Sequence, residues 1–327
     1  MRTAVIGVGH LGQQHARIHA TLAAEELSQF VSVCDLDQDR AQRIGAEWRI
    51  NSTIDWRTLI GKVDAVSLAV PTESHCEIAC SLLEVGIHVL VEKPIAPTLA
   101  EADRMIAAGR DGQAVLQIGH AERFNPALVA LRPHVRHPVY FEIHRVGQFT
   151  ARSLDIDVVL DLMIHDLDIV QWLVGEEVEV TSLHAVGIPI LTERVDAANA
   201  RLEFATGAVA NITASRVGTE KIRKMRFFQP RDYIAVDYTT NHASISNLAP
   251  SGGYGPWPGV STRTLAVKEV EPLRAEIESF LIAAQNRSQP IVSGEDGRRA
   301  LALALRTLDQ IQEHTVRLGV SSSLKNA

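Results

Sequence analysis

The first twelve residues contain the feature that most restricts how this chain can fold. They read MRTAVIGVGHLG, in which a short apolar run, Ala4–Ile6, leads into the pattern Gly7-x-Gly9-x-x-Gly12. Each glycine is needed at its position for a steric reason. Gly7 permits a tight turn, Gly9 lets the backbone approach a pyrophosphate, and Gly12 lets the next helix pack close to the strand. The pattern therefore predicts a strand, a turn and a helix whose free N–H groups bind the phosphates of a dinucleotide.

An acidic residue follows the glycines at the spacing that such a site requires. Val31–Cys34 is predicted as the second strand, and Asp35 ends it about 20 residues beyond the glycines. A carboxylate there accepts hydrogen bonds from a ribose 2′-OH and repels a 2′-phosphate, so NAD is the predicted cofactor. Arg40 and Arg43 in the next predicted helix leave NADP open. The residues predicted to bind the cofactor in this segment are Gly7, Gly9, His10, Leu11, Gly12 and Asp35.

Strand-like and helix-like segments alternate over the first part of the chain. Apolar runs at Ala65–Val70, His88–Val91 and Ala114–Gln117 are typical of parallel strands that are buried on both faces. Helical stretches separate them. The alternation predicts an α/β fold with a Rossmann doubly wound parallel sheet over residues 1–120.

The pattern changes near residue 121. Segments such as Tyr140–Val146 and Ala198–Phe204 alternate in the way a half-exposed sheet requires, and Ala205-Thr206-Gly207 is predicted as a hairpin turn. One helix is expected over Val158–Leu173 and a helical tail over Pro272–Leu318. Residues 121–327 are therefore predicted as an α+β domain with a mostly antiparallel open sheet, which binds substrate and forms the oligomer interface. We expect the C-terminal helix to pack back on the first domain.

The composition narrows the class of protein. A chain of 327 residues with 46% hydrophobic and 22% charged residues is ordinary for a soluble two-domain protein. The net charge of −7 gives no sign of nucleic-acid binding, and no apolar run is long enough for a bilayer. Three cysteines and a start directly in the first strand predict a cytoplasmic protein without a signal peptide.

Glu92-Lys93-Pro94 stands at the end of the predicted strand His88–Val91. Ligands of open α/β sheets lie at the carboxyl ends of the strands, so Lys93 is placed to face the reactive end of the cofactor. A partly desolvated lysine transfers a proton or stabilises an alkoxide. The alternative is a surface lysine in a turn.

A second motif, Asp161-Leu162-Met163-Ile164-His165-Asp166, lies in the predicted helix. Asp161 and His165 are four residues apart and share a face, so the carboxylate can orient the imidazole as a general base. Asp157 and Asp168 lie near that face and raise a divalent metal site as a rival. A structural histidine is the other alternative, and we predict no metal.

These motifs together resemble the Gfo/Idh/MocA family of oxidoreductases over nearly the whole chain. The resemblance rests on GVGHLGQQHA at 7–16, Val70-Pro71-Thr72 with His75, Glu92-Lys93-Pro94 and the Asp161…His165 pair. It implies that Lys93 and His165 flank the reacting carbon, with Asp161 assisting, and leaves open which of the two accepts the proton. The further residues that it places near the cofactor are Pro71, Thr72, His75, Glu92 and Lys93. The family often has Thr-Pro where this chain has Pro71-Thr72.

Three further stretches resemble the branch of the family that contains UDP-N-acetylglucosamine 3-dehydrogenases. They are GHAERFNPAL at 119–128, VVLDLMIHDLDIV at 158–170 and FFQPRDYIAVDY at 227–238. This resemblance implies substrate contacts for Arg123, Asn125 and Arg152, beside Lys93 and His165. Structural ion pairs are the alternative for the two arginines, and a helix N-cap is the alternative for Asn125.

The sequence therefore predicts an NAD(P)-dependent dehydrogenase that oxidises a ring hydroxyl of a sugar to a ketone, with a nucleotide sugar oxidised at C3 as the favoured substrate. We expect a homodimer or homotetramer, because an open sheet needs its second face covered. A free polyol or aldose dehydrogenase is the nearest alternative. A non-catalytic dinucleotide sensor is the alternative outside enzymes.

Overall fold

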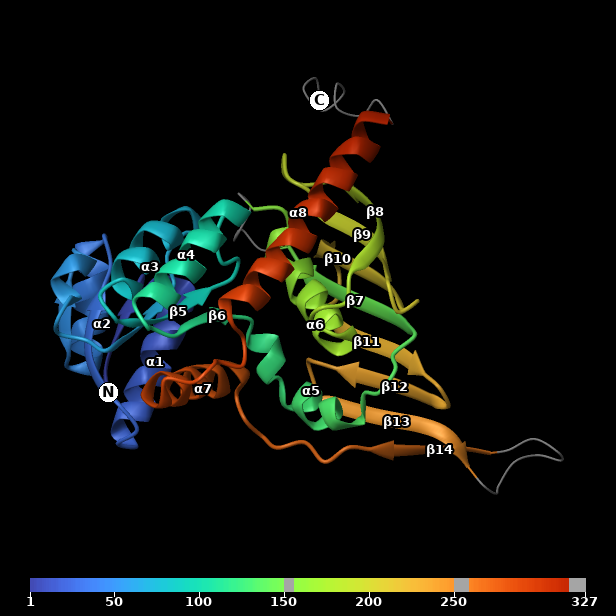
Figure 1. The fold of residues 1–327 in the computed structure, drawn as a ribbon, viewed down its shortest axis with the longest axis horizontal. Coiled ribbons are helices and arrows are strands. Elements are labelled where there is room, and N and C mark those ends of the chain that lie inside the picture. Colours follow the sequence, from blue (N-terminus) through green and yellow to red (C-terminus); the bar gives the residue numbers. More distant parts are fainter. Residues whose placement is uncertain (150–155, 250–258, 318–327) are drawn as a thin grey trace. The chain divides into compact units, whose positions relative to one another are not determined.

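The computed structural model describes residues 1–149, 156–249 and 259–317 (Figure 1). The chain divides into two compact units. The first contains Met1–Phe124 and Val270–Leu301, and the second contains Asn125–Glu269 and the residues from Ala302 onward. The first unit therefore includes a segment that lies far from its other residues in the sequence.

Six parallel strands form the sheet of the first unit, in the order β3-β2-β1-β4-β5-β6. This confirms the predicted doubly wound sheet. The order reverses between β1 and β4, and ligands of such sheets lie outside the carboxyl ends of the strands at that point. The strands are β1 (Arg2–Ile6), β2 (Gln29–Cys34), β3 (Asn51–Thr53), β4 (Ala65–Leu68), β5 (His88–Glu92) and β6 (Leu116–Gly119).

Helices cover both faces of this sheet. On one face, α1 contacts both α2 and α7, and on the other α3 packs against α4. Ile18 and Leu22 of α1 pack with Leu90 of β5 and with Ile277 and Phe280 of α7 in a shared core. Figure 1 shows α7 beside α1, although their sequences are far apart. The helices are α1 (His10–Ala24), α2 (Gln38–Trp48), α3 (His75–Leu83), α4 (Leu99–Asp111) and α7 (Pro272–Asn286), with short 3₁₀ turns η1 (Trp56–Leu59), η2 (Thr72–Ser74) and η3 (Ala121–Phe124).

Eight strands form the sheet of the second unit, in the order β14-β13-β12-β11-β7-β10-β9-β8. Only β7 and β10 pair in parallel, so the sheet is mostly antiparallel, as predicted. The β9–β10 hairpin turns at Gly207, as expected. The strands are β7 (Tyr140–Gln148), β8 (Val180–Ile188), β9 (Ala197–Phe204), β10 (Val209–Gly218), β11 (Ile222–Gln229), β12 (Asp232–Asp237), β13 (His242–Ala249) and β14 (Gly259–Thr264).

Helices of the second unit pack on this sheet. In this unit α6 contacts β10, α5 contacts β12 and β13, and Arg306 of α8 donates a hydrogen bond to the carbonyl oxygen of Val180. Side chains of β9 alternate between buried and exposed, as half-exposed strands require. No helix in the described ranges is both long and apolar enough to cross a membrane. The helices are α5 (Pro126–Leu131), η4 (Arg132–His134), η5 (Val159–Met163), α6 (Ile164–Val174) and α8 (Gly294–Arg317), the last of which begins in the first unit.

Candidate active site

The glycine-rich turn between β1 and α1 has the geometry that the sequence predicts. Gly7 adopts a φ of +81°, which side chains other than hydrogen rarely tolerate. A Cβ atom on Gly12 would overlap the carbonyl oxygen of Gly7, whereas one on Gly9 would point into open space. No side chain caps α1 at Gly9, and its first turn contains no acidic residue. The N–H groups of this turn are therefore suited to binding an anion.

Asp35 lies beside this turn. Its carboxylate accepts hydrogen bonds from the backbone N–H groups of Val8 and Asp37, each at 2.9 Å. The guanidinium of Arg40 lies 3.3 Å from both oxygens and also pairs with the Asp37 carboxylate at 3.0 Å. Arg40, which the sequence leaves open as a ligand of a 2′-phosphate, therefore pairs with Asp35 in this structure.

A cavity of about 580 Å³ begins at the turn and extends past Asp35. Its size is that of an ordinary small-molecule pocket. Leu36 (91% exposed) and Ile54 (52% exposed) contribute to its lining together with Trp56, and such exposed apolar side chains suit a planar base. The cavity, the uncapped helix and the strand-end carboxylate together fit a dinucleotide. Neither Leu36 nor Ile54 was predicted to line the site, although an apolar residue directly after the strand-end acid is a signal that the sequence contains.

His75 connects the segments that follow β4 and β5. It is buried, and its ring nitrogens lie 3.0 Å from the carbonyl oxygens of Val70 and Pro94. Burial lowers the pKa of His75, so its imidazole is neutral near pH 7. His75 thus fixes the turn that contains Lys93. Pro71 lines the cavity, while Thr72 begins the short turn η2.

Glu92 and Lys93 point to different surroundings. Lys93 is partly exposed at the end of β5, whereas the Glu92 carboxylate is buried 2.8 Å from Nε2 of His15 on α1. The sequence analysis placed Glu92 near the cofactor. The structure shows that its carboxylate also has a protein partner 77 positions away, and its place near the cofactor stays a prediction.

The predicted helix at Val158–Leu173 is not regular. It opens with the π-helical turn η5 and continues as α6. Asp161 and His165 are partly exposed, while Met163, Ile164 and Asp166 between and beside them are buried. Both side chains are therefore partly accessible to solvent. Wide turns of this kind occur often at functional sites, and the sequence pattern did not reveal this one.

A buried ion pair holds this helix on the sheet. Nε and Nη2 of Arg145 on β7 lie 2.7 and 2.8 Å from the two carboxylate oxygens of Asp166. The guanidinium also lies over the Tyr238 ring, 5.3 Å from its centroid. Asp157 accepts a hydrogen bond from the backbone N–H of Val195 at 2.9 Å. Asp157 and Asp166 therefore have structural partners. The local sequence pattern gives no sign of the role of Arg145.

The three predicted substrate ligands have different outcomes. Arg123 is buried and pairs with Asp296 at 3.3 Å, which is the ion pair weighed as its alternative. Asn125 caps α5 by accepting a hydrogen bond from the N–H of Ala127 at 3.0 Å, which is again the alternative. Arg152 lies outside the described residues. The described residues contain no group of three or more histidine, cysteine or acidic side chains arranged to hold a metal ion.

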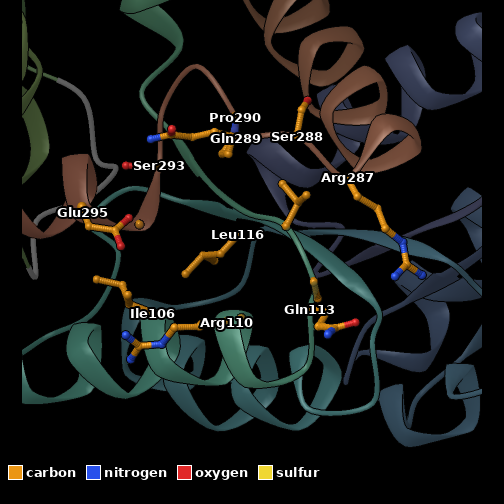
Figure 2. Close-up of a pocket in the computed structure, with 14 residues that line it drawn as sticks. Ile106, Arg110, Gln113, Leu116, Arg287, Ser288, Gln289, Pro290, Ser293 and Glu295 are labelled. Carbon is orange, nitrogen blue, oxygen red and sulfur yellow. The ribbon is translucent and has the colours of Figure 1, made fainter.

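A second cavity of the first unit, about 560 Å³, lies at the opposite edge of the sheet (Figure 2). Figure 2 shows Ile106 and Arg110 of α4, Leu116 at the start of β6, and Glu295 in the first turn of α8 around it. Because β6 is parallel to β1, the start of β6 is far from the carboxyl edge where the glycine-rich turn lies. This cavity is separate from the candidate cofactor site.

Comparisons with known proteins agree with this geometry. The NAD-binding Rossmann-fold domain of the Gfo/Idh/MocA oxidoreductase family matches residues 1–120, and the family's C-terminal domain matches residues 99–228. UDP-N-acetylglucosamine 3-dehydrogenase of Acidithiobacillus ferrooxidans is 39% identical over 94% of this chain and 96% of that protein. Myo-inositol 2-dehydrogenase of Thermotoga maritima is 27% identical over 96% of this chain and 97% of that protein.

Solved structures have the same fold. The Acidithiobacillus ferrooxidans enzyme superposes with a TM-score of 0.89 at 38% identity, over 96% of this chain and 98% of that chain. A levoglucosan dehydrogenase in complex with NADH superposes with a TM-score of 0.85 at 19% identity, over 96% of this chain and 97% of that chain, and supports the fold alone. The chain belongs to the Gfo/Idh/MocA family of NAD-binding oxidoreductases.

Proposed function

We propose that this protein is an NAD-dependent dehydrogenase that oxidises the C3 hydroxyl of UDP-N-acetylglucosamine to a ketone. The observation that carries the proposal is the 39% identity to a UDP-N-acetylglucosamine 3-dehydrogenase over 94% of the chain. A pocket suited to a dinucleotide and a partly exposed Asp161 and His165 pair support it.

The proposed reaction divides hydride transfer and proton transfer between the cofactor and three side chains. When bound, NAD accepts the hydride that leaves the carbon. His165 takes the hydroxyl proton, and Asp161, one turn earlier on the same side of the helix, orients the imidazole. Lys93 hydrogen-bonds the substrate oxygen and stabilises its developing negative charge. In the alternative assignment Lys93 accepts the proton, and Lys93→Met is then more damaging than His165→Asn.

The cofactor contacts are proposed from the first unit. The N–H groups at Gly9, His10 and Leu11 bind the pyrophosphate, and Asp35 accepts the ribose hydroxyls. Leu36 and Ile54 enclose the adenine. Pairing of Arg40 with Asp35 and Asp37 supports NAD over NADP, because a 2′-phosphate would have to displace both carboxylates from that guanidinium.

An arginine is the proposed ligand of the nucleotide part of the substrate. Arg152 stays our proposed ligand for the diphosphate, since a guanidinium binds two phosphate oxygens at once. Asp296 pairs with Nη2 of Arg123, and the first turn of α5 donates to Oδ1 of Asn125, so any substrate contact proposed for these two residues uses their other N–H groups.

A second candidate is a free polyol dehydrogenase, which the 27% identity to a myo-inositol 2-dehydrogenase favours. The test is NADH formation by purified protein with UDP-N-acetylglucosamine, N-acetylglucosamine, myo-inositol and glucose, each supplied with NAD. Turnover with the nucleotide sugar alone, weakened by added salt, is the expected result. Turnover only with free polyols would replace the substrate assignment. Turnover with none of the four would contradict the proposed substrate class.

We further propose a cytoplasmic homodimer or homotetramer. All three cysteines are unpaired and buried, which suits a reducing compartment. Tyr140 and Phe228 stack on the partly exposed side of the second sheet and offer an aromatic surface to a second subunit. Light scattering coupled to gel filtration tests the subunit number, and a monomer would contradict the proposal.

A further inference from the structure

A buried acid of the first unit has no role in the function described above. Glu276 lies on α7 and is 0% exposed. Among the described residues, neither of its carboxyl oxygens has a hydrogen-bond partner. Leaving such a group unsatisfied costs folding free energy, and an apolar side chain at the same position would avoid that cost. An unsatisfied buried acid of this kind calls for a functional explanation.

Glu276 belongs to a polar cluster on the face of the sheet that α1 and α7 cover. Its carboxyl has no hydrogen-bond partner among the described residues, but Nε2 of Gln117 on β6 donates to its backbone carbonyl oxygen at 3.1 Å. The His15–Glu92 pair lies on the same face, because Glu92 is in register with Gly119 and Leu90 with Gln117. The cluster therefore sits at the carboxyl end of β5, next to Lys93.

Titratable and charged groups come from α1, β5 and η3, which pack on α7. From α1 come His15 and His19, and His19 is neutral because burial, with the charge of His15, lowers its pKa to about 3. Glu92 is the acid of β5. The charges of η3 are Glu122 and Arg123, of which Arg123 is paired with Asp296.

The two acids of the cluster hold their protons differently. Burial, together with the negative charge of Glu92, raises the pKa of Glu276 well above its ordinary value. Burial alone would raise the pKa of Glu92 too, but the hydrogen bond and charge of His15 and the charge of Lys93 outweigh it and lower that pKa. Glu276 is therefore the acid that keeps its proton, and Glu92 the one that is ionised.

We propose that Glu276 compensates the charge of the cofactor: it gives up its buried proton when NAD⁺ binds and keeps that proton when NADH binds. The proposal rests on the cofactor site described above. In folds of this kind the nicotinamide lies at the carboxyl ends of the strands, where Lys93 and the cluster are found. NAD⁺ brings a positive ring there, and NADH brings a neutral one. At an effective dielectric constant of about 20, a unit charge about 10 Å from a buried group changes the proton-binding constant of that group about tenfold.

The test is calorimetric binding of NAD⁺ and NADH from about pH 5 to about pH 9, in buffers that differ in ionisation enthalpy. For the wild-type protein we expect proton release with NAD⁺ and an NAD⁺ affinity that rises up to about tenfold with pH. NADH binding should show neither effect. Glu276→Gln, which cannot ionise, should remove both. Glu278→Gln, on the same helix but 41% exposed, is the control and should behave as the wild type.

A stability measurement tests the same point without the cofactor. A folded-state pKa above the unfolded value means that unfolding free energy falls as pH rises from the unfolded value, about 4.3, towards the folded one. Glu276→Gln and Glu276→Met should therefore melt about 2–4 °C above the wild type at neutral pH and equal to it near pH 4.

Several results would overturn the inference. Equal proton release by the wild type and Glu276→Gln, or release by neither, would contradict it while leaving the cofactor site intact. So would a lower melting temperature of both neutral variants at neutral pH. Failure of the wild-type protein to bind NAD⁺ or NADH would contradict the proposed function itself, and the inference with it.

Discussion

In the first unit the backbone itself makes the candidate cofactor site, whereas in the second unit a buried ion pair holds the helix that contains Asp161 and His165. The turn at Gly7 and Gly9 offers N–H groups whose positions follow from chain geometry. The helix in the second unit depends on Arg145, which is 21 positions from its partner Asp166. Local sequence reveals the first arrangement and conceals the second.

The largest expected effect tests the dependence of the second unit on its ion pair. Arg145→Met leaves the Asp166 carboxylate buried without its cation, so we expect a loss of about 3–5 kcal/mol in the free energy of unfolding. Arg201→Met is the control, because Arg201 pairs with Glu203 at 3.5 Å on the exposed side, where a pair contributes about 0–1 kcal/mol. Denaturant titration measures both, and equal losses would show that the buried pair does not anchor the helix.

A smaller effect is expected at the strand-end acid of the first unit. Asp35→Ser removes a charged acceptor, so NAD should bind about 10–100-fold more weakly, corresponding to about 1.5–3 kcal/mol. Discrimination against NADP should fall as well, because the repelling charge is gone and Arg40 loses one of its two carboxylates. Asp39→Ser, an exposed change on α2, is the control. Unchanged NAD affinity in Asp35→Ser, measured by fluorescence titration, would remove Asp35 from the site.

The smallest effect on folding is expected at Gly9. A methyl group there points into open space, so Gly9→Ala should change the free energy of unfolding by no more than about 0.5 kcal/mol. The same methyl group stands where the pyrophosphate approaches, so NAD binding should weaken. Thermal melts with and without NAD separate the two effects. A Gly9→Ala protein that is destabilised but binds NAD normally would contradict the assignment of Gly9 to the pyrophosphate site.

The fold was largely predictable from the sequence because apolar periodicity reports buried strands directly. The exceptions are informative. Strands β3, β13 and β14 were not predicted. The sequences of β3 and β14, NST and GVSTRT, contain few apolar residues. In β13, HASISNLA, the alternation of apolar and polar residues breaks at Asn247. Of these, β3 and β14 each lie at one of the two edges of their sheet. Edge strands need less apolar surface than central ones, so a pattern of burial does not reveal them.

The site was predictable only where residues that are close together in the sequence form it. The turn at Gly7, Asp35 and the position of Lys93 follow from local pattern. His15 with Glu92, and Arg123 with Asp296, are pairs of residues 77 and 173 positions apart, and no local pattern links them. The partner of the Glu92 carboxylate was accordingly not predicted.

The most direct test of the account uses the variant His165→Asn to ask whether the first unit binds the cofactor while the second takes the proton. Its NAD affinity and its NADH formation from UDP-N-acetylglucosamine are both measured. The account predicts an NAD dissociation constant equal to that of the wild type, because the cofactor contacts proposed here lie in the first unit. It predicts turnover reduced about 10²–10⁴-fold, as loss of a general base requires. His184→Asn, an exposed change on β8, should alter neither value. Near-normal turnover of His165→Asn would contradict the account.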